Sequence, residues 1–295
     1  MAFLQLRVSS ADPGFVDEAL MTAGALSVSF IDAEDDPVLE PLPGETPLWR
    51  NTVVLGLFPD GTDVSAVVSL LRELVPDGHA VTVASTLVED QDWVRAWLEH
   101  WQPLRFGRRL WVTPAEKRGE IDANDAIILT LDPGLAFGTG THPTTDLCLR
   151  WLDGLSLKGK TVLDYGCGSG ILAIAALLLG ADRAVAVDID PQALIATRQN
   201  AETNGVADRV ETSLPENFTP FAADVVVANI LSGPLVSLAP LLDRCLADHG
   251  VLALAGLLDR QADEVRAAYA GFLDFAPDAG HEGWTRISGR RAGTR

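Results

Sequence analysis

A glycine-rich stretch, Leu163 to Gly170 (LDYGCGSG), constrains the fold of this 295-residue chain more than any other segment. An apolar run leads into it, and a second apolar run, Ile171 to Leu179, follows it, as in a strand, a tight turn and a helix. Glycine lacks the Cβ that prevents other residues from turning sharply or approaching a ligand closely. The helix that follows begins with unpaired backbone N–H groups that face the turn. The stretch therefore predicts the strand–turn–helix unit of an α/β domain, with a ligand site at the turn.

The spacing of the glycines distinguishes between types of cofactor. The fingerprint of dinucleotide-binding domains, G-x-G-x-x-G, would place its third glycine at position 171, which is Ile171. The stretch instead reads acid-x-G-x-G-x-G, in which Asp164 is the acid and Gly166 and Gly168 are the first two glycines. This pattern resembles motif I of class I S-adenosylmethionine-dependent methyltransferases, which makes these three residues candidates for cofactor binding. A nicotinamide-dependent oxidoreductase is disfavoured, and a purely structural turn is the other interpretation.

A second apolar strand, residues 184–187, ends in Asp188. An acid at that point of an α/β domain is placed to accept hydrogen bonds from both hydroxyls of a ribose. Asp190 and Pro191, just beyond it, are typical of a helix start, in which the aspartate caps the helix and the proline is its first residue. Local structure thus explains Asp190 but not Asp188, and Asp188 is a candidate cofactor ligand.

Strands and helices alternate along the C-terminal part of the chain in the order of a doubly wound sheet. Helices are expected after the first, second, fourth and fifth strands of a seven-stranded core. These strands are expected near residues 161–165, 183–188, 209–213, 223–228, 250–256, 271–276 and 284–288. Two short strands, 110–112 and 127–131, are expected ahead of the core. The fold class is therefore α/β, with a Rossmann-like domain at 105–295.

The first 90 residues follow a different pattern and are expected to form a smaller domain. The pattern predicts strands at 3–8, 26–31, 52–58 and 81–88, one helix from Pro13 to Ala23 and another capped by Asp63. The order βαββαβ is that of ferredoxin-like α+β domains. Because the segment holds no cluster of histidines, cysteines or paired acids with ligand spacing, it is expected to bind a partner rather than perform chemistry.

A helical linker, residues 91–104, is expected between the two domains. Trp93, Trp97 and Trp101 recur every four residues and would form one aromatic stripe along it. Packing between the domains is the favoured interpretation of this stripe, and an exposed recognition surface is the alternative.

Acidic residues dominate the chain and gather toward its start. The net charge is −19, and residues 1–99 alone carry four basic and seventeen acidic side chains, a balance of −13. Such a surface repels phosphate backbones, so direct nucleic-acid binding is not expected, whereas a basic protein partner would be attracted. Solubility alone is the other explanation of the acidic third.

The cysteines and the N-terminus bear on the compartment. Cys148, Cys167 and Cys245 are far apart and form no C-x-x-C pair, so neither a disulfide framework nor a zinc site is indicated. The N-terminus lacks a basic region followed by an apolar one, and no apolar run is long enough to span a bilayer. A soluble, reduced, cytoplasmic protein is expected, with no metal and no membrane contact, and we expect a monomer.

The segment DPGLAFGTGTHPTT, residues 132–145, combines three glycines with two prolines, which excludes regular structure before a helix begins near Pro143. Gly138 and Gly140 have no evident structural purpose, so the segment is expected to close over a bound cofactor, with Gly138 as a contact. His142 is favoured as a structural residue over a catalytic one, because no acid or nucleophile stands near it in sequence.

The strand at 223–228 runs directly into Asn229. Ligands bind at the carboxyl ends of the strands in this architecture. A neutral amide at that point can accept a hydrogen bond from an incoming amine without adding charge. Asn229 is therefore a candidate for positioning an amine substrate, and a simple turn residue is the alternative.

Four motifs together resemble the bacterial ribosomal protein L-eleven methyltransferase family, PrmA: DPGLAFGTGTHPTT, LDYGCGSGILAIAA, VDIDPQA and VVVANILSGPL. The segment DWVRAWLEHWQPLRFGRRLWVTP also resembles the one that precedes the catalytic domain in that family, and the match covers most of residues 92–295. The family implies transfer of methyl groups from S-adenosylmethionine to the α-amine and lysine ε-amines of that ribosomal protein. It also implies that the ferredoxin-like domain recognises the substrate.

The resemblance places family cofactor contacts on Thr145, Gly166, Asp188 and Asn229. The ANIL segment differs from the Asn-Pro-Pro-Tyr of glutamine and adenine methyltransferases, whose flat acceptors need an aromatic stacking partner that a flexible aliphatic amine does not need. No general base is assigned, since the methyl group is already activated. Two alternatives stay open: a methyltransferase of another basic protein or small amine, and a non-catalytic cofactor-binding interaction protein.

Overall fold

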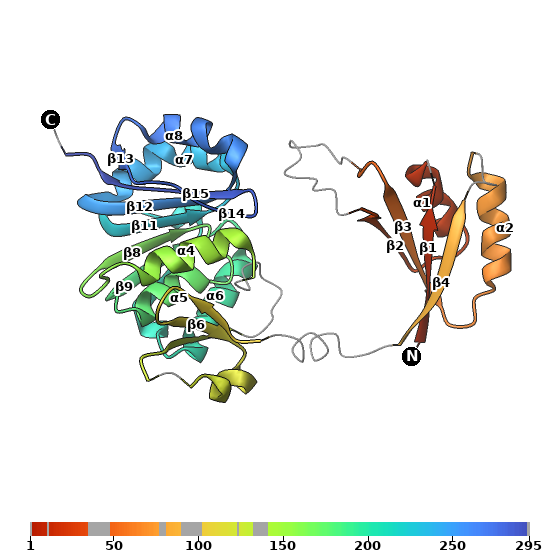
Figure 1. Ribbon diagram of the computed structural model, residues 1–295, viewed down its shortest axis with the longest axis horizontal. Helices are drawn as coiled ribbons and strands as arrows, with labels where there is room; N and C mark the ends of the chain where they lie inside the picture. The colour runs from red at the N-terminus through yellow and green to blue at the C-terminus, as the bar shows by residue number, and fades with distance from the viewer. Residues whose placement is uncertain are drawn as a thin grey trace. The chain divides into compact units, whose positions relative to one another are not determined.

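The computed structural model (Figure 1) describes residues 2–10, 12–34, 48–76, 81–89, 102–122, 124–131 and 141–293. The chain folds as two compact units, residues 1–93 and 94–295. The sequence-predicted linker helix with its tryptophan stripe, the segment 132–140 with Gly138, and residues 35–47 of the smaller unit lie outside the described residues.

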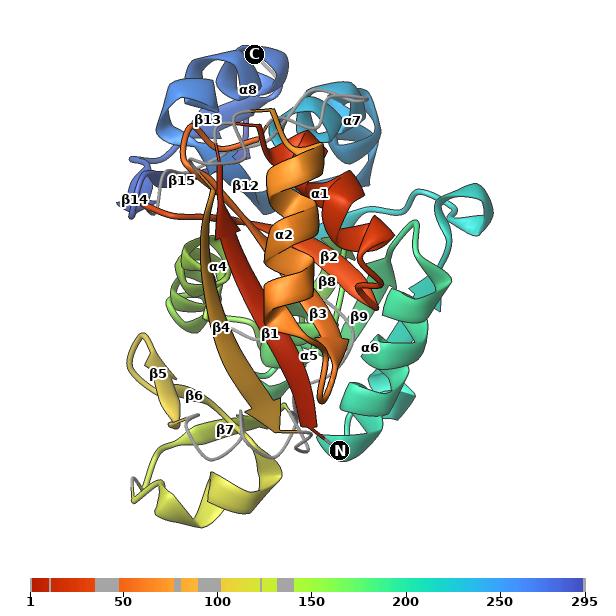
Figure 2. The same cartoon turned by 90° about the vertical axis from the view of Figure 1, so that its right-hand side faces the viewer.

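The smaller unit has the predicted βαββαβ order. Its elements are β1 (Ala2–Ser9), α1 (Pro13–Thr22), β2 (Ser27–Asp32), β3 (Thr52–Pro59), α2 (Val64–Leu74) and β4 (Thr82–Glu89). The strands pair antiparallel in the order β2-β3-β1-β4, and both helices cover one face of the sheet (Figure 2). Asp63 caps α2 as predicted, because its carboxylate accepts hydrogen bonds from the backbone N–H of Ser65 and Ala66 at 2.9 and 3.3 Å. The ferredoxin-like interpretation is confirmed.

The core of the smaller unit is formed by one face of its sheet and by the two helices that cover that face. Leu6 and Val8 of β1 and Phe58 of β3 are fully buried, and they pack against Leu20 of α1 and Leu71 of α2. Strand residues between these positions point to the other face of the sheet, as the period of two requires.

The larger unit is built on an eight-stranded sheet in the order β10-β9-β8-β11-β12-β15-β13, with β14 paired to β15. Strands β8 to β12 run parallel, whereas β15 runs antiparallel to its neighbours. The strands are β8 (Thr161–Tyr165), β9 (Arg183–Val187), β10 (Val210–Ser213), β11 (Ala223–Asn229), β12 (Leu246–Leu258), β13 (Leu273–Phe275), β14 (Ala279–His281) and β15 (Trp284–Arg291). All seven predicted strands are present, and β14 is an addition too short for periodicity to reveal.

Helices connect these strands at the predicted places. They are α5 (Ile171–Leu178), α6 (Pro191–Thr203), α7 (Ser232–Cys245) and α8 (Ala262–Tyr269), with short 3₁₀ turns at Ala207–Arg209, Pro215–Asn217 and Asp259–Gln261. Ahead of the sheet lie a three-stranded sheet of β5 (Leu104–Phe106), β6 (Leu110–Thr113) and β7 (Ile127–Thr130), a 3₁₀ helix (Ala115–Glu120) and α4 (Pro143–Asp153). Strand β5, which has only three residues, was not predicted.

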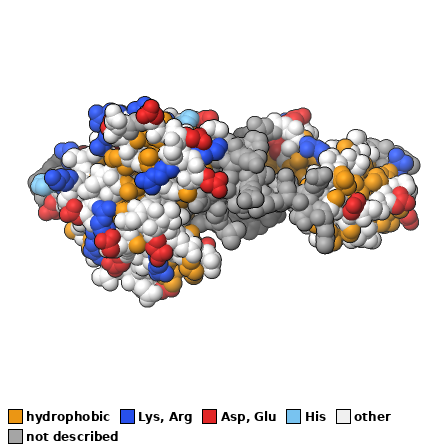
Figure 3. Space-filling model, turned by 90° about the horizontal axis from the view of Figure 1, so that it is seen from below, with side chains coloured by type: hydrophobic (Ala, Val, Ile, Leu, Met, Phe, Trp, Pro, Cys, Tyr) orange, Lys and Arg blue, Asp and Glu red, His pale blue; other side chains and the backbone are white. Residues whose placement is uncertain are grey.

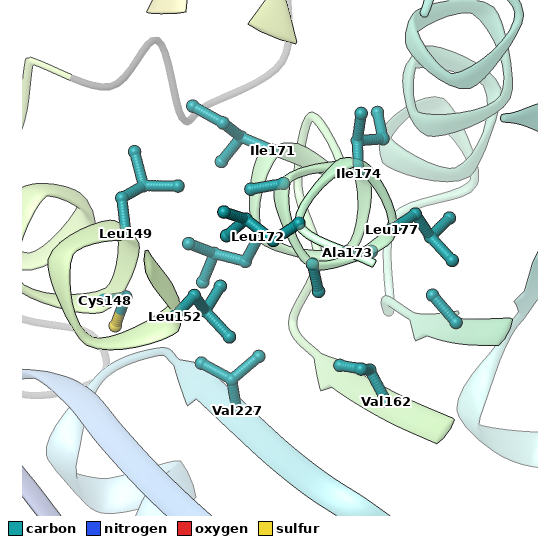
Figure 4. Close-up of a cluster of buried hydrophobic side chains, with 14 of the residues drawn as sticks. Cys148, Leu149, Leu152, Val162, Ile171, Leu172, Ala173, Ile174, Leu177 and Val227 are labelled. Atoms are coloured by element: carbon teal, nitrogen blue, oxygen red, sulfur yellow. The ribbon is translucent and has the colours of Figure 1, made fainter. Parts of the chain in front are cut away.

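Helix α5 lies at the centre of the larger core. All its residues from Ile171 to Leu177 are buried, which explains why its sequence is apolar on every side. Figure 4 shows it between Leu149 and Leu152 of α4 and Val162 and Val227 of the sheet. Since α5 follows the glycine turn directly, this packing fixes the position of the turn.

The surface of the larger unit is charged and mixed in sign. Figure 3 shows acidic and basic side chains interspersed over its visible face. Among the described residues, no helix combines the length and the apolar character needed to cross a lipid bilayer.

Candidate functional site

The glycine turn after β8 has the sharp geometry that the sequence predicts. Gly166, Gly168 and Gly170 have φ values of +84°, +53° and +78°, which other residues rarely adopt. The backbone N–H groups of Gly166 and Cys167 both donate to the carbonyl of Val187, at 2.7 and 3.0 Å. The turn is thereby fixed to the end of β9.

Two side chains of α6 hold the other side of the turn. Thr197 donates its hydroxyl to the carbonyl of Gly168 at 3.0 Å, and Asn200 donates its amide to the carbonyl of Ser169 at 2.8 Å. A Cβ at Gly170 would lie 2.7 Å from the Thr197 side chain, so glycine is required there for close packing. Sequence reasoning missed this contribution, although two polar residues three apart on a helix that follows the motif were the available signal.

Asp188 stands at the end of β9, half-buried, facing the glycine turn. One carboxylate oxygen accepts the backbone N–H of Gly168 at 2.8 Å, and the other accepts that of Asp190 at 3.0 Å. Each carboxylate oxygen can accept a second hydrogen bond, so these contacts leave the acid able to bind two further donors. Asp190 caps α6 by accepting from Gln192 at 2.8 Å, and Pro191 is the first helical residue, both as predicted.

Asp164 lies beneath the turn and is completely buried. Its Oδ2 accepts the backbone N–H of Ala173 at 3.0 Å, whereas its Oδ1 has no hydrogen-bond partner within the described part of the chain. Burial raises the pKa of this carboxyl group to about 7, the charge of Asp188 adds to the rise, and the Ala173 N–H opposes it. A buried acid with an unpaired oxygen beside a glycine turn fits a ligand that brings a cation.

The carboxyl end of β11 forms the second half of the site. Asn229 ends β11, and its side-chain amide lies 3.4 Å from the hydroxyl of Thr145 in the first turn of α4. Thr145 is buried, with 1% of its surface exposed. The structure thus brings together two predicted site residues that are 84 positions apart in the chain.

His142 has a structural role, as favoured from the sequence. Its ring Nδ1 accepts the backbone N–H of Thr144 at 3.3 Å and therefore caps α4. The ring also packs edge-on against Trp284, with 4.8 Å between ring centroids. Partial burial lowers the pKa of His142, so the neutral, cap-forming state is favoured at neutral pH.

The cysteines are unsuited to nucleophilic chemistry. All three are buried, and burial raises the pKa of Cys148 to about 12 and that of Cys167 still further. Thiols with such pKa values stay protonated at neutral pH, and the thiolate is the reactive form. Within the described segments, no three histidine, cysteine or acidic side chains come close enough together to hold a metal ion.

Comparison with known proteins shows which family this chain resembles. A family model described as ribosomal protein L11 methyltransferase (PrmA) matches residues 2–292. A protein named ribosomal protein L11 methyltransferase from Pseudomonas aeruginosa (strain LESB58) is 53% identical over an alignment of 298 positions that covers 99% of each chain. One of the same name from Salmonella heidelberg (strain SL476) is 52% identical over 289 residues, 98% of each chain.

A solved structure points the same way. The crystal structure of a ribosomal protein L11 methylase from Lactobacillus delbrueckii subsp. bulgaricus has 32% sequence identity and a TM-score of 0.60, and the alignment covers 65% of this chain and 99% of that one. The family model spans nearly the whole sequence, and the motifs at the glycine turn, Asp188 and Asn229 meet at one edge of the sheet. This chain belongs to the PrmA family, the ribosomal protein L11 methyltransferases.

Proposed function

We propose that this protein transfers methyl groups from S-adenosylmethionine to the α-amine and lysine ε-amines of ribosomal protein L11. Membership of the PrmA family supports the substrate. The observation that carries the chemistry is the site itself. Two acids flank a glycine turn on one side, and a neutral amide ends the adjacent strand β11 on the other.

The residues around the turn fit the cofactor. Asp188 would accept the ribose hydroxyls through its remaining lone pairs, and Asp164 would face the ammonium of the methionine part with its unpaired oxygen. Ile189, 83% exposed beside Asp188, offers an apolar surface for the adenine ring. When bound, S-adenosylmethionine supplies a methyl group that its sulfonium already activates.

The methyl acceptor must approach as a neutral amine, because an ammonium ion has no lone pair. Asn229 would accept a hydrogen bond from this amine and aim its nitrogen along the axis of the reaction. Ile230 and Leu231 follow it, and Leu231 is 52% exposed, so the approach to Asn229 is apolar. Apolar surroundings lower the pKa of an amine and favour its neutral form. We assign no general base, and the proton passes to water.

The smaller unit is proposed to recognise the substrate. We place this unit at residues 1–90, the linker at 91–104 and the methyltransferase domain at 105–295. The balance of −13 in residues 1–99 favours a basic protein partner over nucleic acid. A monomer acting in the cytoplasm, where ribosomal proteins are made, fits this proposal.

Purified components test the proposed reaction directly. The protein is incubated with tritiated S-adenosylmethionine and purified L11, and mass spectrometry then locates the methyl groups. Label on the α-amine and on lysine side chains of L11 is the expected result. A parallel incubation with a ribosome-free cell extract reveals any other acceptor. Label on another protein or on small amines, with L11 unlabelled, would reject the proposed substrate.

Asp188→Ala is expected to weaken the binding of S-adenosylmethionine by roughly 1.5–3 kcal/mol, because a charged hydrogen-bond acceptor for the ribose is lost. Titration calorimetry measures the affinity. Asp190→Ala is the matched control two residues away. It removes the cap of α6 and should cost roughly 1 kcal/mol of stability without changing the affinity for S-adenosylmethionine. Equal affinities in the two folded variants would remove Asp188 from the cofactor site.

A fragment that starts near Asp92 is expected to bind S-adenosylmethionine with the affinity of the full chain but to methylate L11 poorly. The reason is that every described cofactor residue lies in the larger unit, whereas most of the acidic excess lies in the smaller one. Initial rates across a salt series should fall for the full chain, since salt screens attraction to a basic partner, and should change much less for the fragment. A fragment that methylates L11 at the full rate would place recognition in the catalytic domain.

A further inference from the structure

The residue after Asn229 is enclosed by two glycines from neighbouring strands. Strand β11 lies between β8 and β12, and the three run parallel. Asn229 ends β11 opposite Ala255 of β12, and the N–H of Ile230 donates to the carbonyl of Ala255 at 3.1 Å. Ile230 therefore lies just beyond the end of β11, with Gly166 after β8 on one side and Gly256 of β12 on the other.

Gly256 receives the backbone of Ile230. Its φ of +86° is one that side-chain-bearing residues rarely adopt. A Cβ at this position would overlap the carbonyl oxygen of Ile230 and would lie 2.7 and 2.9 Å from its carbonyl carbon and its nitrogen. The pairing of β12 with β15 also shifts register between Leu254 and Leu257, so the strand is irregular around Gly256. Only glycine permits this approach of the two backbones.

Gly166 receives the side chain of the same isoleucine. Its φ is +84°, and a Cβ there would overlap Cγ2 of Ile230. The space that the absent Cβ leaves at this first glycine of the turn is therefore filled by the isoleucine side chain. Ile230 is thus fixed twice, through its backbone at Gly256 and through its side chain at Gly166.

The hydrogen bonding of Asn229 makes this packing important. The contact between its amide and the Thr145 hydroxyl, at 3.4 Å, is long for a hydrogen bond and constrains the side chain weakly. Methyl transfer requires nucleophile, carbon and sulfur in line, and a displacement of about 1 Å can cost roughly 100-fold in rate. The position of Asn229 must therefore come from its backbone, and the next residue of that backbone is Ile230.

We propose that Gly256 is a positioning residue for the methyl transfer, which places Asn229 by enclosing Ile230 against Gly166. This inference rests on the proposed role of Asn229 in holding the methyl acceptor. Strand β12 contributes no residue to the predicted site. Through Gly256 it would nevertheless control the geometry at the end of β11.

Gly256→Ala tests the inference against Gly250→Ala, a matched substitution in the same strand. A Cβ at Gly250 would also be crowded, at 2.7 Å from Cδ1 of Leu246 and 3.0 Å from the carbonyl oxygen of Ala247, and Gly250 is not among the glycines with positive φ. Both variants are expected to lose stability. Only Gly256→Ala is expected to lose at least tenfold in kcat for L11, while its Kd for S-adenosylmethionine stays within about threefold of the wild type. Equal kcat values for the two variants would overturn the proposal.

Two further variants keep the result interpretable. If Gly256→Ala does not fold, Ile230→Ala replaces it, because it empties the space above Gly166 and should lower kcat severalfold at unchanged cofactor affinity. Wild-type kcat in Ile230→Ala would then reject the proposal. Asn229→Ala is measured alongside: if it keeps the wild-type kcat, the proposed role of Asn229 fails. If Asn229→Ala loses activity while Gly256→Ala keeps it, only the positioning role of Gly256 fails.

Discussion

The ligand-free wild type is expected to lose stability against unfolding as pH rises from 4 to 8, and Asp164→Asn should remove this loss. Between pH 3.8 and about 7 the folded Asp164 keeps its proton whereas the unfolded chain has lost it. The unfolded state then binds fewer protons, so the stability of the wild type falls with rising pH across this window. When the pKa of a carboxyl group is 3.8 in the unfolded chain and about 7 in the folded one, the complete loss of unfolding free energy is roughly 4 kcal/mol, reached above pH 7.

Denaturant unfolding of both proteins at pH 4, 6 and 8 measures this difference. The stability of Asp164→Asn relative to the wild type should increase steadily with pH, by up to roughly 4 kcal/mol between pH 4 and pH 8. Asp153→Asn is the control at another buried acid, one whose carboxylate accepts the backbone N–H of Arg108 at 2.6 Å and lies 3.6 Å from the Arg109 guanidinium. Asp153→Asn should destabilise the protein, because it removes the negative charge that faces the Arg109 guanidinium.

Asp164→Asn should also weaken the binding of S-adenosylmethionine. A cation placed next to the unpaired Oδ1 favours the ionised carboxylate, so binding to the wild type near pH 6.5 should release a proton from Asp164. Calorimetry in two buffers of different ionisation enthalpy detects this release, which Asp164→Asn should lack. Identical proton release by both proteins would contradict the assignment of Asp164 to the ammonium group.

Asn229→Ala is expected to lower kcat for L11 methylation by about 100-fold, because the acceptor amine loses the group that orients it. Single-turnover rates at saturating cofactor measure the chemical step. Asn217→Ala serves as the control, since Asn217 is exposed in the 3₁₀ turn after β10 and has no proposed role. A kcat within twofold of the control would exclude Asn229 from the reaction.

Asn229→Asp should separate orientation from charge. A carboxylate beside the acceptor favours its ammonium form, which has no lone pair, so the rate should drop at pH 7 and recover as pH rises. Asn229→Ala should show a lower rate at every pH without this recovery. A pH–rate profile of the aspartate variant that parallels the wild type would show that the side chain does not contact the amine.

Elements with strong local signals were predicted well. The strands of the main sheet carry apolar runs flanked by turn residues, and a helix start such as Asp190–Pro191 depends on neighbours only two residues away. Strands β5 and β14 have three residues each, which is too few for a period to appear. The pattern also placed Asp164 and Asp188 beside the glycine turn, because Asp164 lies near the end of β8, which leads into the turn, and Asp188 directly follows β9, which pairs with β8.

Features that depend on distant partners were not accessible from the sequence. The role of Thr197 depends on which face α6 turns to the glycine loop, and the contact between Asn229 and Thr145 joins residues 84 positions apart. The raised pKa of Asp164 follows from its complete burial, which composition does not reveal. Gly256 looks like any glycine in an apolar strand until the backbone of Ile230 is seen against it.

The place of β15 in the sheet has a consequence for how the chain folds during synthesis. This strand, Trp284–Arg291, pairs with both β12 and β13, although it follows both of them in the sequence. Because synthesis starts at the N-terminus, β12 exposes an unpaired edge until β15 has also been made. An exposed edge of apolar strand invites pairing with other chains. The larger unit thus passes through an aggregation-prone stage that ends only when its last strand inserts, whereas the smaller unit can close its own sheet about 200 residues earlier.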